Sequence, residues 1–424
     1  MKVLVIGFTH LGMVYSACFT SKGVDVSLAR SELHDESVYD YQHLKAEPNL
    51  YDIIEESERK GKFSFVRLSH LVLSDYDLIF IAEDTSLDSQ GNPLHQRIIE
   101  IIEYVDEKNL SGVPVVLMSQ VFPGFCAMSK IKSPLIYWVE TLVFGKAIDR
   151  ATNPEQIVLG FRFTDMKIPD ALSSLLELFS RPIIRMSWES AELTKISFNF
   201  MLSMSVLGSN FLASVAEEVG ANWSEIKNAL RLDARIGKSA YLDPGLGITG
   251  GNLPRDLATL RSIAIKMSRT NQKFLNSIMN FNENQILWLI ECIEYLENIH
   301  LFAKKSNSIG LLGLSYKVGT SSTLNSPSIR LAQIYSKNHF LAFDPVVKYV
   351  SNVNNIEICP SITNLFERSQ TLILITPWPE ILDALQSPTH SFKNQNIIDA
   401  GSWLDSEILM RFNNHRQRGR GSNA

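Results

Sequence analysis

Short apolar runs, each followed by a turn and a helix-compatible segment, recur along this chain of 424 residues. The first run covers residues 2–6, and a glycine-bearing turn at residues 7–12 leads from it into a helix-compatible segment that ends near Gly23. Further apolar runs lie at residues 24–29, 78–82, 113–118 and 308–312. Strands that alternate with helices in this way predict an α/β fold.

A much longer helical pattern occupies residues 187–218. Ser187 and Ser190 are both candidate N-caps. Apolar side chains recur along this segment at helical spacing, at Leu193, Ile196, Phe200, Leu207 and Phe211. The chain remains helical in pattern between residues 258 and 300, and a second strand-turn-helix unit begins at residue 308. The pattern therefore predicts two α/β units separated by a helical part.

The composition is that of a soluble globular protein, and it argues against a nucleic acid or a membrane as a partner. The length suggests two or three domains, and 45% hydrophobic with 20% charged residues is ordinary for such a protein. A formal charge of -5 gives no reason to expect a nucleic acid as the main partner. No continuous apolar run reaches the roughly 18 residues of a membrane span, so we expect no membrane association. Because the first strand begins directly after Met1, we expect no signal peptide.

The four cysteines are scattered along the chain, at Cys18, Cys126, Cys292 and Cys359. Their spacing matches neither a metal site nor a redox pair. We therefore expect no bound metal and a reduced, cytoplasmic setting.

The turn at residues 7–12 is typical of the start of a dinucleotide-binding unit, in which a helix N-terminus faces the pyrophosphate. Gly7 and Gly12 fit the fingerprint of such a turn, and Leu11 directly precedes the second of them. Thr9 stands where a central glycine normally lets the backbone approach the phosphates. These four residues are the candidate cofactor-binding residues of the turn.

The most glycine-rich stretch lies at residues 233–257. Four glycines follow Pro244 within seven positions, at Gly245, Gly247, Gly250 and Gly251. Such a segment needs backbone conformations closed to other residues, or it approaches a ligand closely. An ordinary connector would not explain the polar residues on either side of it, which are Arg235, Asn252, Arg255 and Asp256. We interpret this segment as a ligand-binding loop.

At these residues the chain resembles the UDP-glucose/GDP-mannose dehydrogenases, whose substrate loop reads Asp-x-Arg-Ile-Gly, an aromatic, and Pro-Gly-x-Gly-Phe-Gly-Gly-Ser-Cys-Phe-Pro-Lys-Asp. The residues in register are Asp233, Arg235, Ile236, Gly237, Tyr241, Pro244, Gly245, Gly247, Gly250, Pro254 and Asp256. Asn252 stands in the place of the family's catalytic cysteine. The resemblance runs from Met1 to about Asp405, and it implies two Rossmann-like, doubly wound domains joined by a long central helix.

The resemblance also implies a domain organisation. It divides the chain into an N-terminal dinucleotide-binding domain at 1–186, a central helical dimerisation and substrate domain at 187–304, and a C-terminal nucleotide-sugar-binding domain at 305–412. The last residues, 413–424, are basic and aperiodic, and we expect them to form a disordered tail. Because the family's central helix forms a dimer core, a homodimer is implied.

Several catalytic positions follow from the resemblance. Residues 191–199 match the family's Ala-Glu-x-x-Lys-x-x-x-Asn, and Lys195 and Asn199, four residues apart, share one helix face. With Asp256, they are expected to form a proton relay.

Three further positions concern the acyl intermediate of the family's reaction. Glu140 falls on a glutamate proposed as acid and base for its hydrolysis, and Gln120 replaces a threonine that helps to hold the catalytic water. The family's cysteine forms this intermediate by capturing the aldehyde. Asn252 cannot do so, because an amide nitrogen has no available lone pair.

The expected substrate is a nucleotide sugar, with a UDP-sugar favoured. Within the glycine loop, the resemblance assigns substrate contacts to Arg235, Tyr241, Gly247 and Gly250. Lys317 lies in residues 313–320, which resemble the family's Gly-Leu-x-Phe-Lys-x-x-Thr and would contact the nucleotide diphosphate. We expect the ligand between the central helix, the glycine loop and the C-terminal fold.

The expected cofactor is NAD or NADP. Arg30 follows the second apolar run at the position where an acidic residue normally binds the adenosine ribose of NAD, so it favours the 2′-phosphate of NADP. A solvated arginine is the alternative. Thr85 lies in a segment where the family's Val-Pro-Thr-Pro is replaced by Glu83-Asp84-Thr85-Ser86. Two carboxylates there would repel the cofactor phosphates if they pointed inward.

Three functions remain open at this point. The prediction for this chain is a dehydrogenase that oxidises the C6 alcohol of a nucleotide sugar with a nicotinamide cofactor. The second is a related oxidoreductase that stops at the aldehyde or epimerises the sugar. The third is a nucleotide-sugar-binding protein without catalysis.

Overall fold

The protein is described here by a computed structural model, which covers residues 1–30, 47–88, 93–299, 308–336, 338–351 and 353–421. The chain divides into two compact units, Met1–Phe198 and Asn199–Ala424. The longest helix, α7 (Trp188–Val219), runs through the boundary between these units. The expected domain boundary at residue 304 lies outside the described residues, and the division into three domains stays a prediction.

The first unit is built on a sheet in which eight strands pair in the order β10-β9-β8-β7-β4-β1-β2-β3 within the described residues. All neighbouring strands are parallel except β8 and β9. The strands are β1 (Lys2–Ile6), β2 (Asp25–Ala29), β3 (Phe63–Val66), β4 (Leu78–Ile81), β7 (Val115–Leu117), β8 (Leu135–Val139), β9 (Ile157–Phe161) and β10 (Ile183–Ser187). The chain order reverses between β1 and β4, and this switch point is where doubly wound sheets bind ligands.

Alternation along β1 explains why helices cover both faces of this sheet. Val3 and Val5 pack on one face with α1 (His10–Ser21), α2 (Leu50–Arg59), α5 (Ala147–Thr152) and α6 (Asp170–Glu177). Leu4 and Ile6 pack on the other face with α3 (Gln96–Lys108) and α4 (Phe125–Met128). A separate hairpin joins β5 (Ser86–Leu87) to β6 (Pro93–Leu94). The predicted α/β fold with doubly wound character is confirmed.

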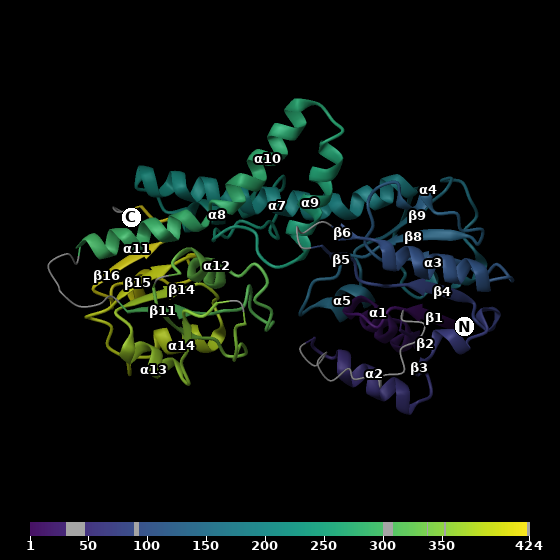
Figure 1. Ribbon diagram of the computed structural model, residues 1–424, viewed down its shortest axis with the longest axis horizontal. Coiled ribbons are helices and arrows are strands. Elements are labelled where there is room, and N and C mark those ends of the chain that lie inside the picture. The colour runs from purple at the N-terminus through teal and green to yellow at the C-terminus, as the bar shows by residue number, and fades with distance from the viewer. Residues whose placement is uncertain (31–46, 89–92, 300–307, 337, 352, 422–424) are drawn as a thin grey trace. The chain divides into compact units, whose positions relative to one another are not determined.

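The second unit contains a fully parallel sheet with the strand order β13-β12-β11-β14-β15-β16. Its strands are β11 (Ile309–Leu312), β12 (Phe340–Phe343), β13 (Ile356–Ile358), β14 (Thr371–Leu374), β15 (Asn396–Asp399) and β16 (Asn414–Gln417). The yellow strands β14, β15 and β16 lie side by side in Figure 1. The order reverses between β11 and β14, so this unit has a switch point of its own.

Helices surround this second sheet on both faces. One face carries α11 (Ile286–Ile299) and α12 (Pro327–Ile334), and the other carries α13 (Ile362–Arg368), α14 (Pro379–Gln386) and α15 (Ser406–Leu409). The remaining helices of the unit are α8 (Trp223–Leu232), α9 (Asn252–Ala264) and α10 (Arg269–Glu283). A small apolar core joins α7, α9 and α10 through Leu207, Leu257 and Leu275.

Helix α7 matches the long helix predicted from the sequence. Of the two candidate caps, Ser187 is the one that precedes the helix, and its hydroxyl accepts a hydrogen bond from the N–H of Ser190 at 3.3 Å. Among the described residues, α7 is also the one helix long and apolar enough to cross a membrane by length and composition. The prediction from the sequence included no such segment, because it rested only on continuous apolar runs. The mean hydropathy over 18 residues of the helix stays high even though serines and asparagines interrupt the apolar residues. The central helix of a soluble protein can pass the same test.

The expected disordered tail is wrong for residues 414–421. Strand β16 forms the edge of the second sheet, and Arg418, directly after it, is 2% exposed. Arg418 Nη2 donates to Gln285 Oε1 at 3.0 Å, and the guanidinium lies over the ring of Trp288. The N–H of Gly419 donates to Glu217 Oε1 at 2.6 Å. Arg418, one of the charges that suggested disorder, is thus used as a buried hydrogen-bond donor.

We expect Arg418→Ala to lower the free energy of unfolding by about 3 kcal/mol, because it leaves buried acceptors without their donor. Urea unfolding measures this change. Arg269→Ala removes an exposed arginine from the start of α10 and is the matched control, with an expected change within about 0.5 kcal/mol. Equal stability of the two variants would show that the segment is not anchored through Arg418.

Candidate functional site

The turn after β1 connects this strand to α1, as predicted, and it lies at the switch point of the first sheet. A Cβ on Gly7 would lie 2.5 Å from the carbonyl oxygen of Ala82 at the end of β4, so only glycine fits there. Thr9 is the N-cap of α1: its hydroxyl donates to the Ala82 carbonyl at 2.7 Å and accepts from the N–H of Gly12 at 3.0 Å. Leu11 packs against the core beneath the helix.

This geometry bears on cofactor binding. The first N–H groups of a helix have no acceptor within the helix and can bind phosphate. In α1 the Thr9 hydroxyl already satisfies one of them, that of Gly12. The chain therefore has the close-packed turn and the helix that are typical of a dinucleotide site. One N–H donor of that helix, the Gly12 N–H, is already bonded to the Thr9 hydroxyl.

Two other expected cofactor residues lie near the same edge of the sheet. Arg30 follows β2 directly, and its guanidinium lies 5.1 Å from the ring centroid of Phe8, a residue of the turn. Thr85 is buried after β4 and donates from its hydroxyl to the backbone oxygen of Gln120 at 2.5 Å. The segments that follow β4 and β7 are thereby tied together at the carboxyl ends of their strands.

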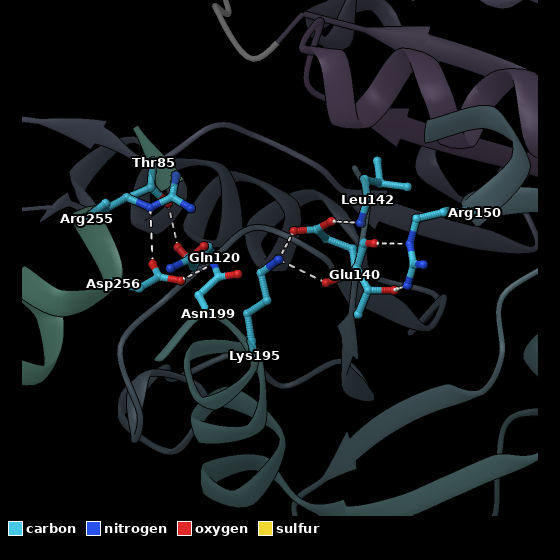
Figure 2. A network of polar contacts seen from close by, with 10 residues as sticks. Thr85, Gln120, Glu140, Leu142, Arg150, Lys195, Asn199, Arg255 and Asp256 are labelled. Atoms are coloured by element: carbon cyan, nitrogen blue, oxygen red, sulfur yellow. Dashed lines mark hydrogen bonds and ion pairs between the residues drawn. The ribbon is translucent and has the colours of Figure 1, made fainter. Parts of the chain in front are cut away.

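Lys195 and Glu140 form an ion pair within the first unit (Figure 2). Lys195, on α7, also donates to the backbone oxygen of Glu140 at 2.9 Å. The second carboxylate oxygen of Glu140 accepts from the N–H of Leu142 at 2.8 Å. Lys195 is 8% exposed, so this charged pair is shielded from water and held in one geometry.

Asn199 and Asp256 form the corresponding pair within the second unit (Figure 2). The Asn199 amide donates to Asp256 Oδ2 at 2.5 Å, and Arg255 Nε lies 3.4 Å from Oδ1. Asp256 is 1% exposed. Lys195 and Asn199 are one helical turn apart on α7, and each is bonded to a different carboxylate.

The glycine loop is fixed to the turn that follows β11. Gly250 has a φ of +75°, and a Cβ at this position would lie 2.6 Å from the ring of Tyr316. The Asn325 amide donates to the Gly250 carbonyl at 2.8 Å, and the Thr249 hydroxyl donates to the Tyr316 carbonyl at 3.3 Å. The loop and the switch point of the second sheet therefore form one surface.

Lys317 belongs to this same turn, next to Tyr316, with its ammonium 5.7 Å from the tyrosine ring centroid. The turn itself is held by Asp344 at the end of β12, whose carboxylate accepts the N–H groups of Leu314 and Ser315 at 2.7 and 2.9 Å. Burial raises the pKa of the Tyr316 phenol.

The other expected substrate residues lie along the approach to the loop. Gly247 packs beside Asn282, whose side-chain oxygen accepts the N–H of Ile248 at 2.6 Å. The backbone oxygen of Tyr241 accepts hydrogen bonds from two serines of α7, and the residue is 44% exposed. Arg235 is 89% exposed and is paired with Asp233 at 2.6 Å.

Asn252 is exposed and is the first residue of α9, immediately after the glycine loop. The cysteines offer no replacement for a thiol at this position, because Cys18, Cys126, Cys292 and Cys359 are all buried. Burial raises the pKa of Cys18 and of Cys292 to about 12. A thiolate nucleophile is therefore not supplied by any cysteine of the chain.

Three residues contribute to these sites without having been singled out from the sequence. Tyr316 and Asn325 hold the glycine loop, and buried Glu192 accepts the N–H groups of Gly124 and Cys126 at 2.5 and 2.8 Å in the segment that follows Gln120. Burial raises the pKa of the Glu192 carboxyl. Glu192 is part of the motif that residues 191–199 match, but no contact was assigned to it from the sequence.

Three models of one protein family match the chain. They are described as the NAD binding, central and UDP binding domains of the UDP-glucose/GDP-mannose dehydrogenase family, and they match residues 1–173, 189–284 and 310–406.

Individual relatives extend this likeness over most of the chain. The UDP-glucose 6-dehydrogenase TuaD of Bacillus subtilis is 25% identical over 96% of this chain and 90% of its own length. The GDP-mannose 6-dehydrogenase of Pseudomonas aeruginosa is 25% identical over 82% of each chain. The solved structure of a UDP-glucose dehydrogenase from Pyrobaculum islandicum shares the fold with a TM-score of 0.81, at 20% identity, over 98% of this chain and 96% of that one.

We expect Gly250→Ala to destabilise the protein by about 2 kcal/mol or more, because the new methyl group would meet the Tyr316 ring and the backbone would be strained at a positive φ. Urea unfolding measures the change. Gly245→Ala is the matched control in the same loop, since a Cβ there meets nothing within 4 Å. If both variants were equally stable, the loop would not rest on Tyr316.

Proposed function

The chain belongs to the UDP-glucose/GDP-mannose dehydrogenase family, and from this premise we propose that it is a nucleotide-sugar dehydrogenase that oxidises the C6 alcohol of a UDP-sugar. The observation that carries the proposal is the contact between the glycine loop and the turn after β11. The Thr249 hydroxyl donates to the Tyr316 carbonyl, and the Asn325 amide donates to the Gly250 carbonyl. Lys317 follows Tyr316 in the same turn, and its ammonium suits a diphosphate. A ligand with a sugar at one end and a diphosphate at the other matches this surface.

A nicotinamide dinucleotide fits the first unit, and when bound it supplies the acceptor for a hydride. Gly7 and Gly12 keep the turn close to the strand ends, and α1 directs its N-terminus to the pyrophosphate position. Arg30, beside Phe8 at the end of β2, would face the adenosine ribose. A cation there favours the 2′-phosphate of NADP over the two hydroxyls of NAD.

The polar pairs supply the acid-base chemistry of the proposal. Oxidation of an alcohol requires that its proton be removed and that the developing alkoxide be stabilised. In this proposal Asp256, which is bonded to Asn199, accepts the proton of the alcohol, either directly or through a water molecule. Lys195 and Asn199 provide the donors that stabilise an alkoxide oxygen. Glu140 keeps the ammonium of Lys195 in place.

Asn252 limits the reaction that this site can complete. An aldehyde product cannot be captured covalently by an amide side chain, and the four cysteines are buried. The second oxidation would then require the hydrated aldehyde, with Gln120 and Glu140 available to hold its water. We therefore expect one hydride transfer per sugar and release of the aldehyde, which is the activity of the second candidate function.

Binding without catalysis is the third candidate, and one observation favours it. The Thr9 hydroxyl occupies the Gly12 N–H that a pyrophosphate would use, so cofactor affinity would be lower than in a turn with glycine at this position.

The proposed assembly is a cytoplasmic homodimer formed through α7. Several large apolar side chains of the helix are exposed, among them Met201 at 66%, Phe211 at 56% and Val219 at 69%. A row of such residues at helical spacing is a surface that a second copy would cover. A monomeric mass in sedimentation equilibrium at micromolar protein would contradict the dimer.

To test the function, purified protein is mixed with UDP-sugars and with GDP-sugars, in the presence of NAD or of NADP, and the absorbance of the reduced nicotinamide is recorded. Mass spectrometry then identifies the sugar product and any adduct on the protein. We expect one equivalent of reduced cofactor per UDP-sugar, an aldehyde product and no acyl adduct on the protein. Stoichiometric uronic acid from the unaltered protein would overturn this mechanism.

Asn252→Cys tests the role of the missing nucleophile. We expect acid formation to rise in this variant, because a thiol at the start of α9 can capture the aldehyde and is favoured as a thiolate by the helix N-terminus. Asn252→Ser is the control, since it is of similar polarity without a thiol. If the Asn252→Cys variant bound cofactor but formed neither aldehyde nor acid, the result would support the third candidate function, which is binding without catalysis.

Arg30→Asp tests the cofactor preference. A charge-assisted contact to phosphate is worth about 1.5 to 3 kcal/mol, so we expect the ratio of the dissociation constants for NADP and NAD to reverse by at least about tenfold. Isothermal titration calorimetry with both cofactors measures this ratio. An unchanged ratio would show that Arg30 is a solvated residue.

A further inference from the structure

A cavity of about 260 Å³ lies at the edge of the second sheet, where strand β16 has no further strand beside it among the described residues. Its lining comes from β16 and the residues around it, together with α11: Tyr295, Asn413, Asn414, His415, Arg416, Gln417, Arg420 and Gly421. None of these residues belongs to the sites assigned above.

The cavity carries positive charge on side chains that are held in place. The Arg416 guanidinium lies 3.8 Å from the ring centroid of Tyr295, and Arg420 donates to the hydroxyl of Ser406 at 2.9 Å. Burial, together with Arg420 and Arg416, lowers the pKa of His415. A guanidinium fixed by a ring or a hydroxyl loses little conformational entropy when it binds an anion.

The acidic residues near this charge lie outside the lining of the cavity, and Glu217 among them interacts electrostatically with Arg416. No carboxylate is among its lining residues. A second cavity of about 280 Å³ shares Tyr295, Arg416, Gln417 and Arg420, and it adds Glu217 and Glu291. Glu217 accepts from the N–H of Gly419 at 2.6 Å and from Trp288 at 2.7 Å, and Glu291 is exposed.

We propose that the cavity at β16 binds a small phosphate-bearing metabolite, with Arg416 and Arg420 on the phosphate oxygens and the amides of Asn413 and Asn414 on the remainder of the molecule. Planar guanidinium groups match phosphate geometry with paired hydrogen bonds. The volume exceeds that of inorganic phosphate and is below the range for a drug-sized ligand, which suits a phosphorylated sugar.

Binding at this place would act on the fold around it. The strand that lines the cavity continues into Arg418 and Gly419, which bond to Gln285 and to Glu217 on α7. An anion at Arg416 would therefore stabilise the attachment of the last strand to the helices of the same unit.

The test is a histidine NMR titration of the full chain with inorganic phosphate and with a hexose phosphate, at constant ionic strength set with chloride. His415→Gln assigns the resonance. Burial, with the added charges of Arg420 and Arg416, holds the pKa of His415 down. A bound anion should raise this pKa by offsetting the arginine charges, and chloride alone should not. We expect the hexose phosphate to bind more tightly than inorganic phosphate. No change in the pKa of His415 at millimolar concentrations of either ligand would overturn the proposal.

Variants then locate the bound phosphate. Arg416→Gln and Arg420→Gln should each weaken binding by at least about tenfold, and Arg269→Gln, an exposed arginine that lines neither cavity, should leave it unchanged. Without ligand, the Arg416→Gln variant should have a higher pKa at His415 than the unaltered protein, because one of the charges that lower it is removed. This change serves as a control that the cavity is still folded in the variant. Phosphate binding that survives both substitutions but disappears in Lys317→Gln would assign the anion to the nucleotide-sugar surface and overturn the site at β16.

Discussion

The contact between Gly250 and the ring of Tyr316 constrains the whole second unit. No side chain fits between the loop and the ring, and the loop backbone at that point has a positive φ. The hydrogen bonds from Asn325 and Thr249 hold the same two segments together from either side. Because the ring belongs to the turn at the switch point of the sheet, the helical part and the sheet cannot separate without losing the surface that the proposed ligand would occupy.

Much of this architecture was predictable from the sequence because it rests on local rules. An apolar run followed by glycine and a helix identified β1 with α1, and again β11 with its turn. The length and spacing of α7 could be read from its apolar positions and from Ser187. These features depend on backbone geometry and on periodicity, and both are determined by residues that are close together in the sequence.

The partners of the polar residues do not follow from local rules. The resemblance grouped Lys195 and Asn199 with Asp256, and Asn199 does meet Asp256, 57 positions away. Lys195 instead meets Glu140, 55 positions away, and nothing in the sequence indicated this pairing. The error at the C-terminus has the same origin. Gln417 donates to buried Asp399 and to the Leu404 carbonyl, and Arg418 to Gln285, so this polar segment is ordered by acceptors elsewhere in the chain. Composition alone contains no information about such acceptors.

The burial of all four cysteines has a practical consequence for studying this molecule. Their thiols are shielded, and burial raises the pKa of Cys18 and of Cys292 to about 12. Reagents that alkylate thiolates should therefore leave the native chain unmodified. One cysteine introduced on the surface of each unit would then take a fluorophore or a spin label without competition from the natural thiols. The protein is in this sense already prepared for distance measurements between its two units, without removal of any natural residue.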